Sequence, residues 1–267
     1  MLLAVDIGNT HTVAGLFAID SVPASDPSHR WRWRTSRDAT SDELAATVAQ
    51  VLALDGLAFE DVERIVISSV VPTLTTAWRA LGSRLGQERP ALVVGPGLRT
   101  GLRIATKEPH EVGSDRIVNA VAAWERYATA CIVADLGTAT TLDVVDGDGT
   151  YIGGAIGPGL AISVEALVAR AARLATVELH VPERAIGRDT ADAVRSGTML
   201  GAIAQLEGLA ARVRAELIEY HGVAADAHVP MIATGGWASV LGQHVTGLDA
   251  VDPDLTLRGL QLVALHR

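Results

Sequence analysis

The chain has 267 residues, which is close to the size at which one hydrophobic core tends to divide into two. Its formal net charge of −9 argues against a nucleic-acid-binding surface, and an aromatic content of 4% leaves little material for base stacking. We therefore expect two domains of similar size and a small-molecule substrate, with no nucleic-acid partner.

The N-terminal apolar run is interrupted by Asp6 and has no basic region before it, unlike a signal peptide or a membrane anchor. A single cysteine, Cys131, excludes a disulfide framework and a thiolate metal cluster, and it opens an apolar run typical of a buried strand. We expect a cytoplasmic protein without a membrane partner.

Lys107 is the only lysine, and no Gly-x-x-x-x-Gly-Lys sequence is present. This excludes a P-loop, because its lysine must reach the outer phosphates of the nucleotide. Any phosphate must then be bound by hairpin turns or helix ends.

One pattern occurs twice, at residues 1–17 and 131–146. A short apolar run leads to an acid, a glycine follows two places later, and small hydroxyl residues precede a second apolar run. This predicts strand, tight turn and strand, with Gly8 and Gly137 at the turns. Backbone N–H groups and hydroxyls on such a turn can bind a phosphate, and two such hairpins facing each other would hold one nucleotide.

The acids of the two hairpins have a different predicted task. A carboxylate repels a polyphosphate unless a cation intervenes, so Asp6 and Asp135 are candidate ligands, direct or through water, of Mg²⁺ or a monovalent ion. The alternative for either copy is an ordinary hairpin with an acidic turn, and the repetition favours phosphate binding.

The first half continues as alternating strands and helices. Residues 31–35 (Trp-Arg-Trp-Arg-Thr) predict a strand with its tryptophans packed inside, and Thr40 with Glu43 forms a capping box that begins a helix. Strands are then expected at 64–70 and 91–95, with a helix between them around residues 74–85. This order is typical of a ribonuclease-H-like α/β domain.

Residues 111–128 predict a helix that begins near Ser114 or Asp115, just after Gly113. A helix N-terminus favours the ionised form of Asp115, so we expect a carboxylate at neutral pH. Asp115 is either a simple cap or, with Arg116 beside it, part of a functional site.

In the second half, the repeated hairpin is followed by a predicted strand at 151–156, a turn at 157–160 and a helix at about 163–174. Thr190 is expected to cap a long helix. Residues 229–239 predict a strand that ends at Thr234, Gly235 and Gly236, where the backbone can approach a ring or ribose closely, although a plain strand-to-helix turn would also use glycines. Residues 256–265 predict an amphipathic helix.

Together, the repeated hairpin and the Ala-Thr-Gly-Gly turn at 233–236 resemble the phosphate 1, phosphate 2 and adenosine motifs of the actin, hexokinase and heat-shock ATPase superfamily. Within it, the chain resembles the type III pantothenate kinases from end to end. The segments that carry this resemblance are 6–12, 111–123, 135–146, 153–160, 186–190, 233–236 and 255–260. The resemblance implies two ribonuclease-H-like (actin-like ATPase) domains, each with a mixed sheet led by a duplicated ββ-hairpin. We place them at residues 1–116 and 117–267.

The same resemblance implies transfer of the ATP γ-phosphate to pantothenate, the first step toward coenzyme A, in a homodimer with the pantothenate pocket near the subunit interface. Asp115 would be the catalytic base, Asp6 would lie near the Mg²⁺ carried by ATP, and Asp135 would hold K⁺ or NH₄⁺. The implied ATP-binding residues are Asp6, Ile7, Gly8, Asn9, Thr10, His11, Thr12, Val13, Thr138, Gly235 and Gly236. The implied pantothenate-binding residues are Gly113, Ser114, Asp115, Arg116 and Thr190.

The segment before Gly113 departs from the family pattern. Residues 106–109 are Thr-Lys-Glu-Pro where the family usually has Tyr-Asp-Asn-Pro. The aromatic wall of the pocket is therefore missing at Thr106, and an acid, Glu108, stands where an amide is usual. Ser114 in place of the usual alanine is a minor difference. The alternatives are a kinase of the same fold that acts on another small hydroxyl acid, and a non-catalytic ATP-binding accessory regulator.

Overall fold

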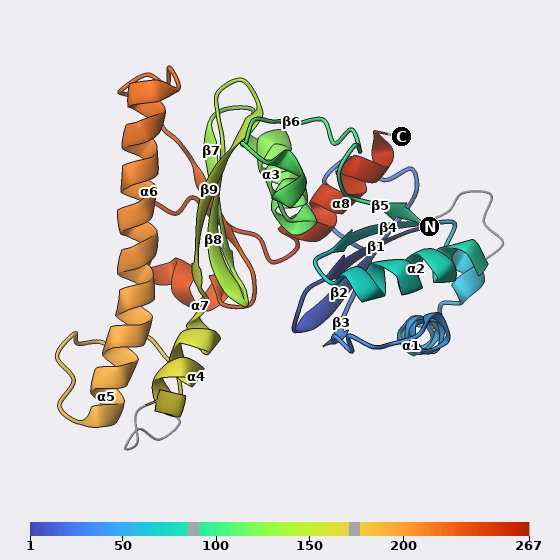
Figure 1. Ribbon diagram of the computed structural model, residues 1–267, viewed down its shortest axis with the longest axis horizontal. Helices are drawn as coiled ribbons and strands as arrows, with labels where there is room; N and C mark the ends of the chain where they lie inside the picture. Colours follow the sequence, from blue (N-terminus) through green and yellow to red (C-terminus); the bar gives the residue numbers. More distant parts are fainter. Residues whose placement is uncertain (85–90, 171–176, 267) are drawn as a thin grey trace. The chain divides into compact units, whose positions relative to one another are not determined.

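The computed structural model describes residues 1–84, 91–170 and 177–266, which form two compact units. The first unit comprises Met1–Leu102, Lys107–Glu125 and Asp254–Arg267, and the second comprises Arg103–Thr106 and Arg126–Pro253. The boundary expected after residue 116 lies inside a helix, and the C-terminal helix returns to the first unit (Figure 1).

The first unit contains a five-stranded mixed sheet in the order β3-β2-β1-β4-β5. Strands β1, β2 and β3 are antiparallel neighbours, whereas β4 and β5 add in parallel. The strands are β1 (Leu2–Ile7), β2 (His11–Phe17), β3 (His29–Arg34), β4 (Arg64–Ser69) and β5 (Leu92–Val93). The predicted first hairpin and the strands that follow it are confirmed.

Helices α1 (Ser41–Leu54) and α2 (Pro72–Arg84) pack on one face of this sheet. Their buried side chains, including Leu44, Val48 and Trp78, join a core with the alternate residues of β1 and β4. The α2 prediction is confirmed up to residue 84, and residue 85 lies outside the described part of the chain.

Helix α8 (Leu255–Leu265) packs against β1, β2 and β4, and helix α3 (Ser114–Tyr127) crosses it closely. At the crossing, a Cβ on Gly259 would collide with the carbonyl oxygen of Val118, and Thr256 Oγ1 donates a hydrogen bond to Asn119 Oδ1 at 2.8 Å. Two short 3₁₀ turns, η1 (Phe59–Asp61) and η2 (Pro109–Glu111), complete the unit.

Two local signals in this unit form as the sequence predicts. The N–H of Glu43 donates to Thr40 Oγ1 at 3.3 Å and the N–H of Thr40 donates to Glu43 Oε2 at 2.8 Å, which is a complete capping box. Trp31 is buried, and its Nε1 donates to Asp55 Oδ2 at 2.7 Å, so the tryptophan is a packing residue as expected.

The second unit repeats the first with one added edge strand. Its six-stranded sheet has the order β11-β10-β7-β8-β9-β6, in which β7, β8 and β9 are antiparallel and β10 and β11 add in parallel. The strands are β6 (Arg103–Ile104), β7 (Cys131–Leu136), β8 (Ala139–Val145), β9 (Thr150–Pro158), β10 (Met231–Thr234) and β11 (Ala250–Val251). The duplicated hairpin-led sheet is therefore confirmed, while β6 was not predicted.

One face of this second sheet is covered by a long helical segment. Helix α5 (Thr190–Arg195), the π-helical turn η3 (Ser196–Leu200) and helix α6 (Gly201–Tyr220) follow one another directly, and α6 buries apolar side chains against the sheet. The expected cap at Thr190 is wrong: Asp189 is the N-cap and accepts a hydrogen bond from the N–H of Asp192 at 2.8 Å.

Three short elements complete the unit: α4 (Leu160–Arg170), α7 (Ala238–Leu241) and η4 (Gly242–His244). The helix expected at 163–174 begins earlier, at Leu160, and residues 171–174 lie outside the described ranges. Cys131 is fully buried as predicted, and burial raises the pKa of its thiol to about 12. Over the described ranges, no helix has the length and apolar character needed to cross a membrane.

Candidate active site

The first hairpin turn is held closed by the end of strand β3. The N–H of Gly8 donates to the carbonyl of His11 at 3.1 Å, and Thr35 Oγ1 donates to the carbonyl of Gly8 at 2.8 Å. The N–H of Thr35 also donates to the carbonyl of Thr10 at 3.0 Å. Because these bonds lie behind the turn, Asn9 and Thr10 remain exposed at its tip.

Asp6 lies near the carboxyl end of β1, opposite Ser68 on the parallel strand β4. The hydroxyl oxygens of Ser68 and Ser114 are 3.0 Å apart, and the N–H of Ser69 donates to Ser114 Oγ at 3.0 Å. Helix α3 therefore begins against the end of β4. The structure thus places Asp6 and Asp115 at the carboxyl ends of the neighbouring strands β1 and β4.

Asp115 is in the first turn of α3, as predicted, and its Oδ1 accepts a hydrogen bond from the N–H of Arg116 at 2.8 Å. Burial raises the pKa of the Asp115 carboxyl above its ordinary value, and this effect outweighs the bond from Arg116 and its positive charge, which act in the opposite direction. The expected shift toward the ionised form is therefore wrong in direction, because desolvation exceeds the helix-end effect. A Cβ on Gly113 would collide with Asp115 Oδ1, so a side chain at residue 113 would displace this carboxylate from its position.

In the second unit, two glycine turns meet at Asp135. A Cβ added to Gly137 would lie 3.3 Å from Asp135 Oδ1, and one added to Gly235 would lie 2.5 Å from the same oxygen. Gly235 also has a φ of +91°, a conformation that L-residues with a side chain rarely adopt. The second hairpin and the Thr234–Gly236 turn, predicted as separate motifs, therefore adjoin one carboxylate.

The two glycines of the third motif have different roles. Gly235 is required by packing within the protein, whereas a Cβ added to Gly236 would have no protein atom within 4 Å. Of the two, only Gly236 faces open space, and a glycine in such a position lets a ligand approach the backbone closely. Thr138, at the second hairpin, accepts a hydrogen bond from the N–H of Gly159 at 3.2 Å through its carbonyl.

The carboxylate oxygens of Asp6 and Asp135 are ligands that suit hard cations such as Mg²⁺. In the described part of the chain, however, no group of three or more His, Cys, Asp or Glu side chains is arranged to hold a metal ion without further ligands. Asp6 and Asp135 each offer a carboxylate, and a hydroxyl residue stands opposite each of them in the strand register: Ser68 opposite Asp6, and Thr141 and Thr234 opposite Asp135. Mg²⁺ is commonly bound through one or two carboxylates together with substrate phosphates, so Asp6 fits a metal that arrives with a nucleotide.

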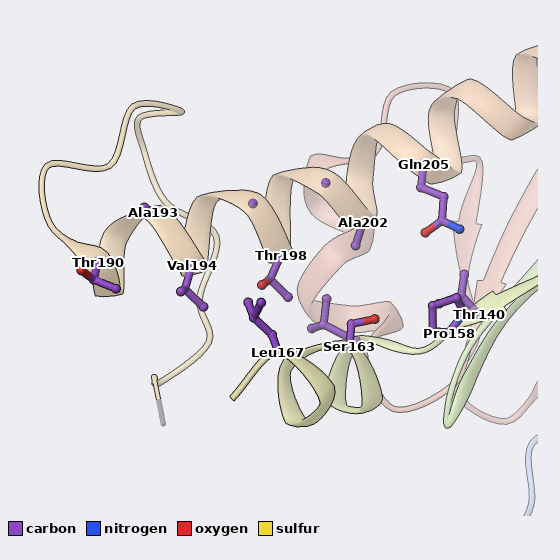
Figure 2. A pocket seen from close by; sticks show the side chains of 13 residues that line it. Thr140, Pro158, Ser163, Leu167, Thr190, Ala193, Val194, Thr198, Ala202 and Gln205 are labelled. Atoms are coloured by element: carbon purple, nitrogen blue, oxygen red, sulfur yellow. The ribbon is translucent and has the colours of Figure 1, made fainter. Parts of the chain in front are cut away.

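Thr190 lines a pocket of about 620 Å³ in the second unit. Figure 2 shows Thr190 at one end of this pocket and Thr140, Pro158 and Gln205 at the other, with Ser163 and Leu167 of α4 facing the helical segment. The π-helical turn supplies Gly197 and Thr198 to the lining, and such turns are frequent at functional sites.

Sequence reasoning missed Ser68 and Thr35, which position the α3 N-terminus and the first hairpin turn. Both act on segments distant in the chain, and nothing in the local pattern distinguishes them from other strand-end hydroxyl residues.

The paired hairpin-led sheets, with an acid at the same place in each, define an actin-like ATPase fold. Solved structures agree. A putative Baf family transcriptional activator from Campylobacter jejuni has a TM-score of 0.60 and 16% identity, covering 99% of this chain and 98% of that one. A putative 2-dehydro-3-deoxygalactonokinase from Sinorhizobium meliloti has a TM-score of 0.50 and 14% identity, covering 99% and 96%. At such low identity, these likenesses concern the fold alone.

Sequence comparison defines the family. A family model described as type III pantothenate kinase matches residues 2–212. The chain is 46% identical over 261 residues to the type III pantothenate kinase of Thermomicrobium roseum (98% of this chain, 95% of the relative) and 42% identical over 263 residues to that of Moorella thermoacetica (98% of each). The chain belongs to the type III pantothenate kinase family.

Proposed function

We propose that the protein transfers the γ-phosphoryl group of ATP to the primary hydroxyl of pantothenate and so forms 4′-phosphopantothenate, the first step toward coenzyme A. Family membership supports the reaction. One structural observation carries the proposal. The Ser68–Ser114 contact holds Asp115 at the carboxyl end of β4, next to the end of β1 where Asp6 lies. The turn proposed to bind phosphate and the residue proposed as the base therefore belong to the same unit.

In this proposal Asp115 accepts the proton of the pantothenate hydroxyl while that oxygen attacks the γ-phosphorus. The bond from the γ-phosphorus to the bridging oxygen breaks, and ADP leaves with its electron pair. Burial raises the pKa of Asp115, and a carboxylate with a higher pKa is a stronger base than an exposed aspartate when it is ionised. Gly113, Ser114 and Arg116 are proposed to bind the acceptor beside it.

The nucleotide is proposed to bind along Asp6–Val13, and Thr138, Gly235 and Gly236 are proposed as further nucleotide-binding residues. The exposed tip at Asn9 and Thr10 and the open space at Gly236 support these assignments. Asp6 would hold the Mg²⁺ carried by ATP, which would neutralise charge on the outer phosphates. The protein's own contribution is to fix the positions of the reacting groups.

Asp135 is proposed to hold a monovalent cation, K⁺ or NH₄⁺. Its carboxylate adjoins the glycine turns at Gly137 and Gly235, and its oxygen is the kind of ligand that such cations prefer. A single carboxylate balances a single positive charge, and this ion would adjoin the second phosphate-binding turn.

A homodimer is proposed from the family resemblance and from the surface around the Thr190 pocket. Four large apolar side chains are exposed on β9, on α4 and in the segment before α5: Ile156, Ile162, Leu167 and Ile186. An apolar surface of this kind is typical of a protein–protein interface. Thr190 would then serve the substrate site near that interface. A cytoplasmic location stays a prediction.

The deciding experiment is mass-spectrometric detection of 4′-phosphopantothenate after incubation with pantothenate, ATP, Mg²⁺ and K⁺. The expected result is product from the wild type and at least about 100-fold slower formation by Asp115→Asn. If ATP binds and no phosphopantothenate forms, the proposed acceptor is wrong.

A second acceptor deserves the same assay because of Thr106. Its Oγ1 is buried and, among the described residues, has no hydrogen-bond partner, and its methyl group lies 4.0 Å from where a Cβ on Gly153 would be. A hydroxyl stands where the family usually has an aromatic ring, which favours a more polar acceptor. A panel of small hydroxyl acids would detect it, and ATP binding without turnover on any acceptor would indicate an accessory regulator.

A further inference from the structure

Three arginines alternate along strand β3 and share one face of the first sheet. Arg32 pairs with Val13 of β2, and Val13 pairs with Asp6 of β1, so Arg32 and Asp6 occupy one cross-strand row on the same face. Two strand spacings separate their Cα atoms by roughly 10 Å, which a pair of long side chains and a bound phosphate can span. Arg34 pairs with His11, one row closer to the hairpin turn.

Of the three arginines, Arg30 has a carboxylate partner, whereas Arg32 and Arg34 do not in the described part of the chain. Arg30 forms an ion pair with Asp254, with Nε 2.8 Å from Oδ1. Throughout the ranges that the structure describes, no carboxylate is paired with the guanidinium of Arg32 or of Arg34, and both side chains are exposed. On the other side of the turn, Arg37 Nη2 donates to Asn9 Oδ1 at 3.1 Å, so a third guanidinium adjoins the same loop.

The pKa of His11 reflects both its burial and the positive charges of Arg32 and Arg34. Burial lowers this pKa most, and the two guanidinium charges lower it further. Arg32 Nη2 lies 3.0 Å from His11 Nδ1, and because a guanidinium can only donate, Nδ1 must be the acceptor. The neutral ring then carries its proton on Nε2, where it is one more donor.

Such a concentration of positive charge is unusual in a chain with a net charge of −9 and one lysine. Neighbouring cations repel one another, and an anion between them relieves the repulsion. The planar fork of arginine matches the oxygens of a phosphate and forms charge-assisted hydrogen bonds with them.

We propose that Arg32 and Arg34 form an anion-binding subsite that binds the terminal phosphate of the nucleotide held by the Asp6–Val13 turn, with Arg32 as the principal ligand. This inference rests on the proposed function of that turn. Arg32 is placed to contact the transferred phosphoryl group itself, because it shares a row with Asp6. Arg34 lies nearer the turn tip and supplies charge.

The test is titration calorimetry of the full-length protein with inorganic tripolyphosphate and Mg²⁺ at constant ionic strength. Arg32→Gln is expected to raise the dissociation constant about tenfold, which is the loss of one charge-assisted hydrogen-bonded contact, and Arg34→Gln to raise it less. Arg32→Lys keeps the charge and loses the fork, so it is expected to fall between wild type and Arg32→Gln.

Arg30→Gln is the matched control, since it removes the same charge from the same strand and face at a position already neutralised by Asp254. It is expected to bind tripolyphosphate as the wild type does. Wild-type affinity in both Arg32→Gln and Arg34→Gln, or an equal loss in Arg30→Gln, would overturn the proposal. Circular dichroism of each variant separates loss of binding from loss of folding.

The same samples are assayed for 4′-phosphopantothenate, so that the two proposals fail separately. If the wild type makes no product while tripolyphosphate binding still depends on Arg32, the acceptor assignment fails and the anion subsite stands. If product forms, and Arg32→Gln changes neither the KM for ATP nor kcat, the pantothenate kinase assignment stands and the subsite fails.

Discussion

The hydroxyl oxygens of Ser68 and Ser114 lie 3.0 Å apart, between the end of β4 and the first residue of α3. This contact joins segments 46 positions apart in the chain and determines where Asp115 is held relative to Asp6 on the neighbouring strand β1. The candidate base and the candidate nucleotide loop thus both lie at the carboxyl ends of the neighbouring strands β1 and β4.

Replacing Asp115 by asparagine is expected to lower kcat by about 10²- to 10⁴-fold, the usual contribution of a positioned general base. Affinity for ATP should change little, because Asp115 acts on the acceptor. Steady-state kinetics together with nucleotide titration measure the two effects. Near-normal turnover in this variant would remove Asp115 from the mechanism.

The pH dependence of activity and of stability should have opposite signs at Asp115. Activity needs the carboxylate, so kcat/KM should fall as pH drops through a pKa above the ordinary aspartate value of about 4. Because the folded-state pKa is raised, folding is favoured by protonation at low pH, and that stabilisation is lost as pH rises through the folded pKa. At neutral pH, Asp115→Asn should therefore unfold at a temperature no lower than the wild type does, which calorimetry can check.

Ser114→Ala is expected to lower the free energy of unfolding by about 1 kcal/mol, since it removes the bond to Ser68 and leaves the N–H of Ser69 without its acceptor. The effect on kcat should be small, because Asp115 keeps its own bond to the N–H of Arg116. Ser83→Ala is the control: it removes an exposed hydroxyl that bonds only within helix α2. Equal chemical-denaturation midpoints for the two variants would contradict the prediction.

The two glycines of the third motif should respond differently to alanine. Gly235→Ala places a methyl group against Asp135 at a positive φ, so we expect destabilisation and loss of activation by K⁺. Gly236→Ala adds a methyl group in open space, so the fold should persist and only nucleotide affinity should fall. Thermal unfolding and ATP titration distinguish the two, and unchanged ATP affinity in Gly236→Ala would argue against a ligand at that glycine.

Asp135→Asn is expected to abolish the dependence of activity on K⁺ or NH₄⁺ while the protein remains folded. The reason is that the amide retains the shape of the carboxylate and loses its charge. Asp148→Asn, in the exposed turn between β8 and β9, is the control and should keep the wild-type response. A wild-type K⁺ titration curve in Asp135→Asn would place the cation elsewhere.

Ile186→Glu should shift the protein from dimer to monomer, because it puts a charge on a side chain that is 84% exposed beside the Thr190 pocket. Leu54→Glu changes a side chain that is 81% exposed on α1 of the first unit and should leave the dimer intact. Light scattering coupled to size exclusion measures both masses. A monomeric wild type would refute the homodimer itself.

The elements with a local cause could be predicted from the sequence. The two hairpins follow from an acid, a glycine and flanking apolar runs, and the capping box of Thr40 and Glu43 from residues three positions apart. The tryptophan face of β3 follows from strict alternation. Each of these signals lies within one element, so neighbouring residues are sufficient to determine it.

Other features depended on packing that no local pattern records. The short strand β6 pairs with β9 across 47 positions, and α8 returns to the first unit from the end of the chain. The cap at Asp189 in place of Thr190 shows that an exact helix end is set by which side chain reaches the free N–H groups.

The sequence by itself predicted the repeated hairpin turns, the duplicated α/β architecture and Asp6, Asp115 and Asp135 as the candidate carboxylates of the site. Only the tertiary structure decided that Ser68 joins Ser114 and that Gly235 must be glycine because of Asp135. It also decided that burial raises the pKa of Asp115 and that Arg32 shares a row with Asp6. The physical reason is that turns and caps arise from neighbouring residues, whereas strand order, register and desolvation depend on which distant segments pack together.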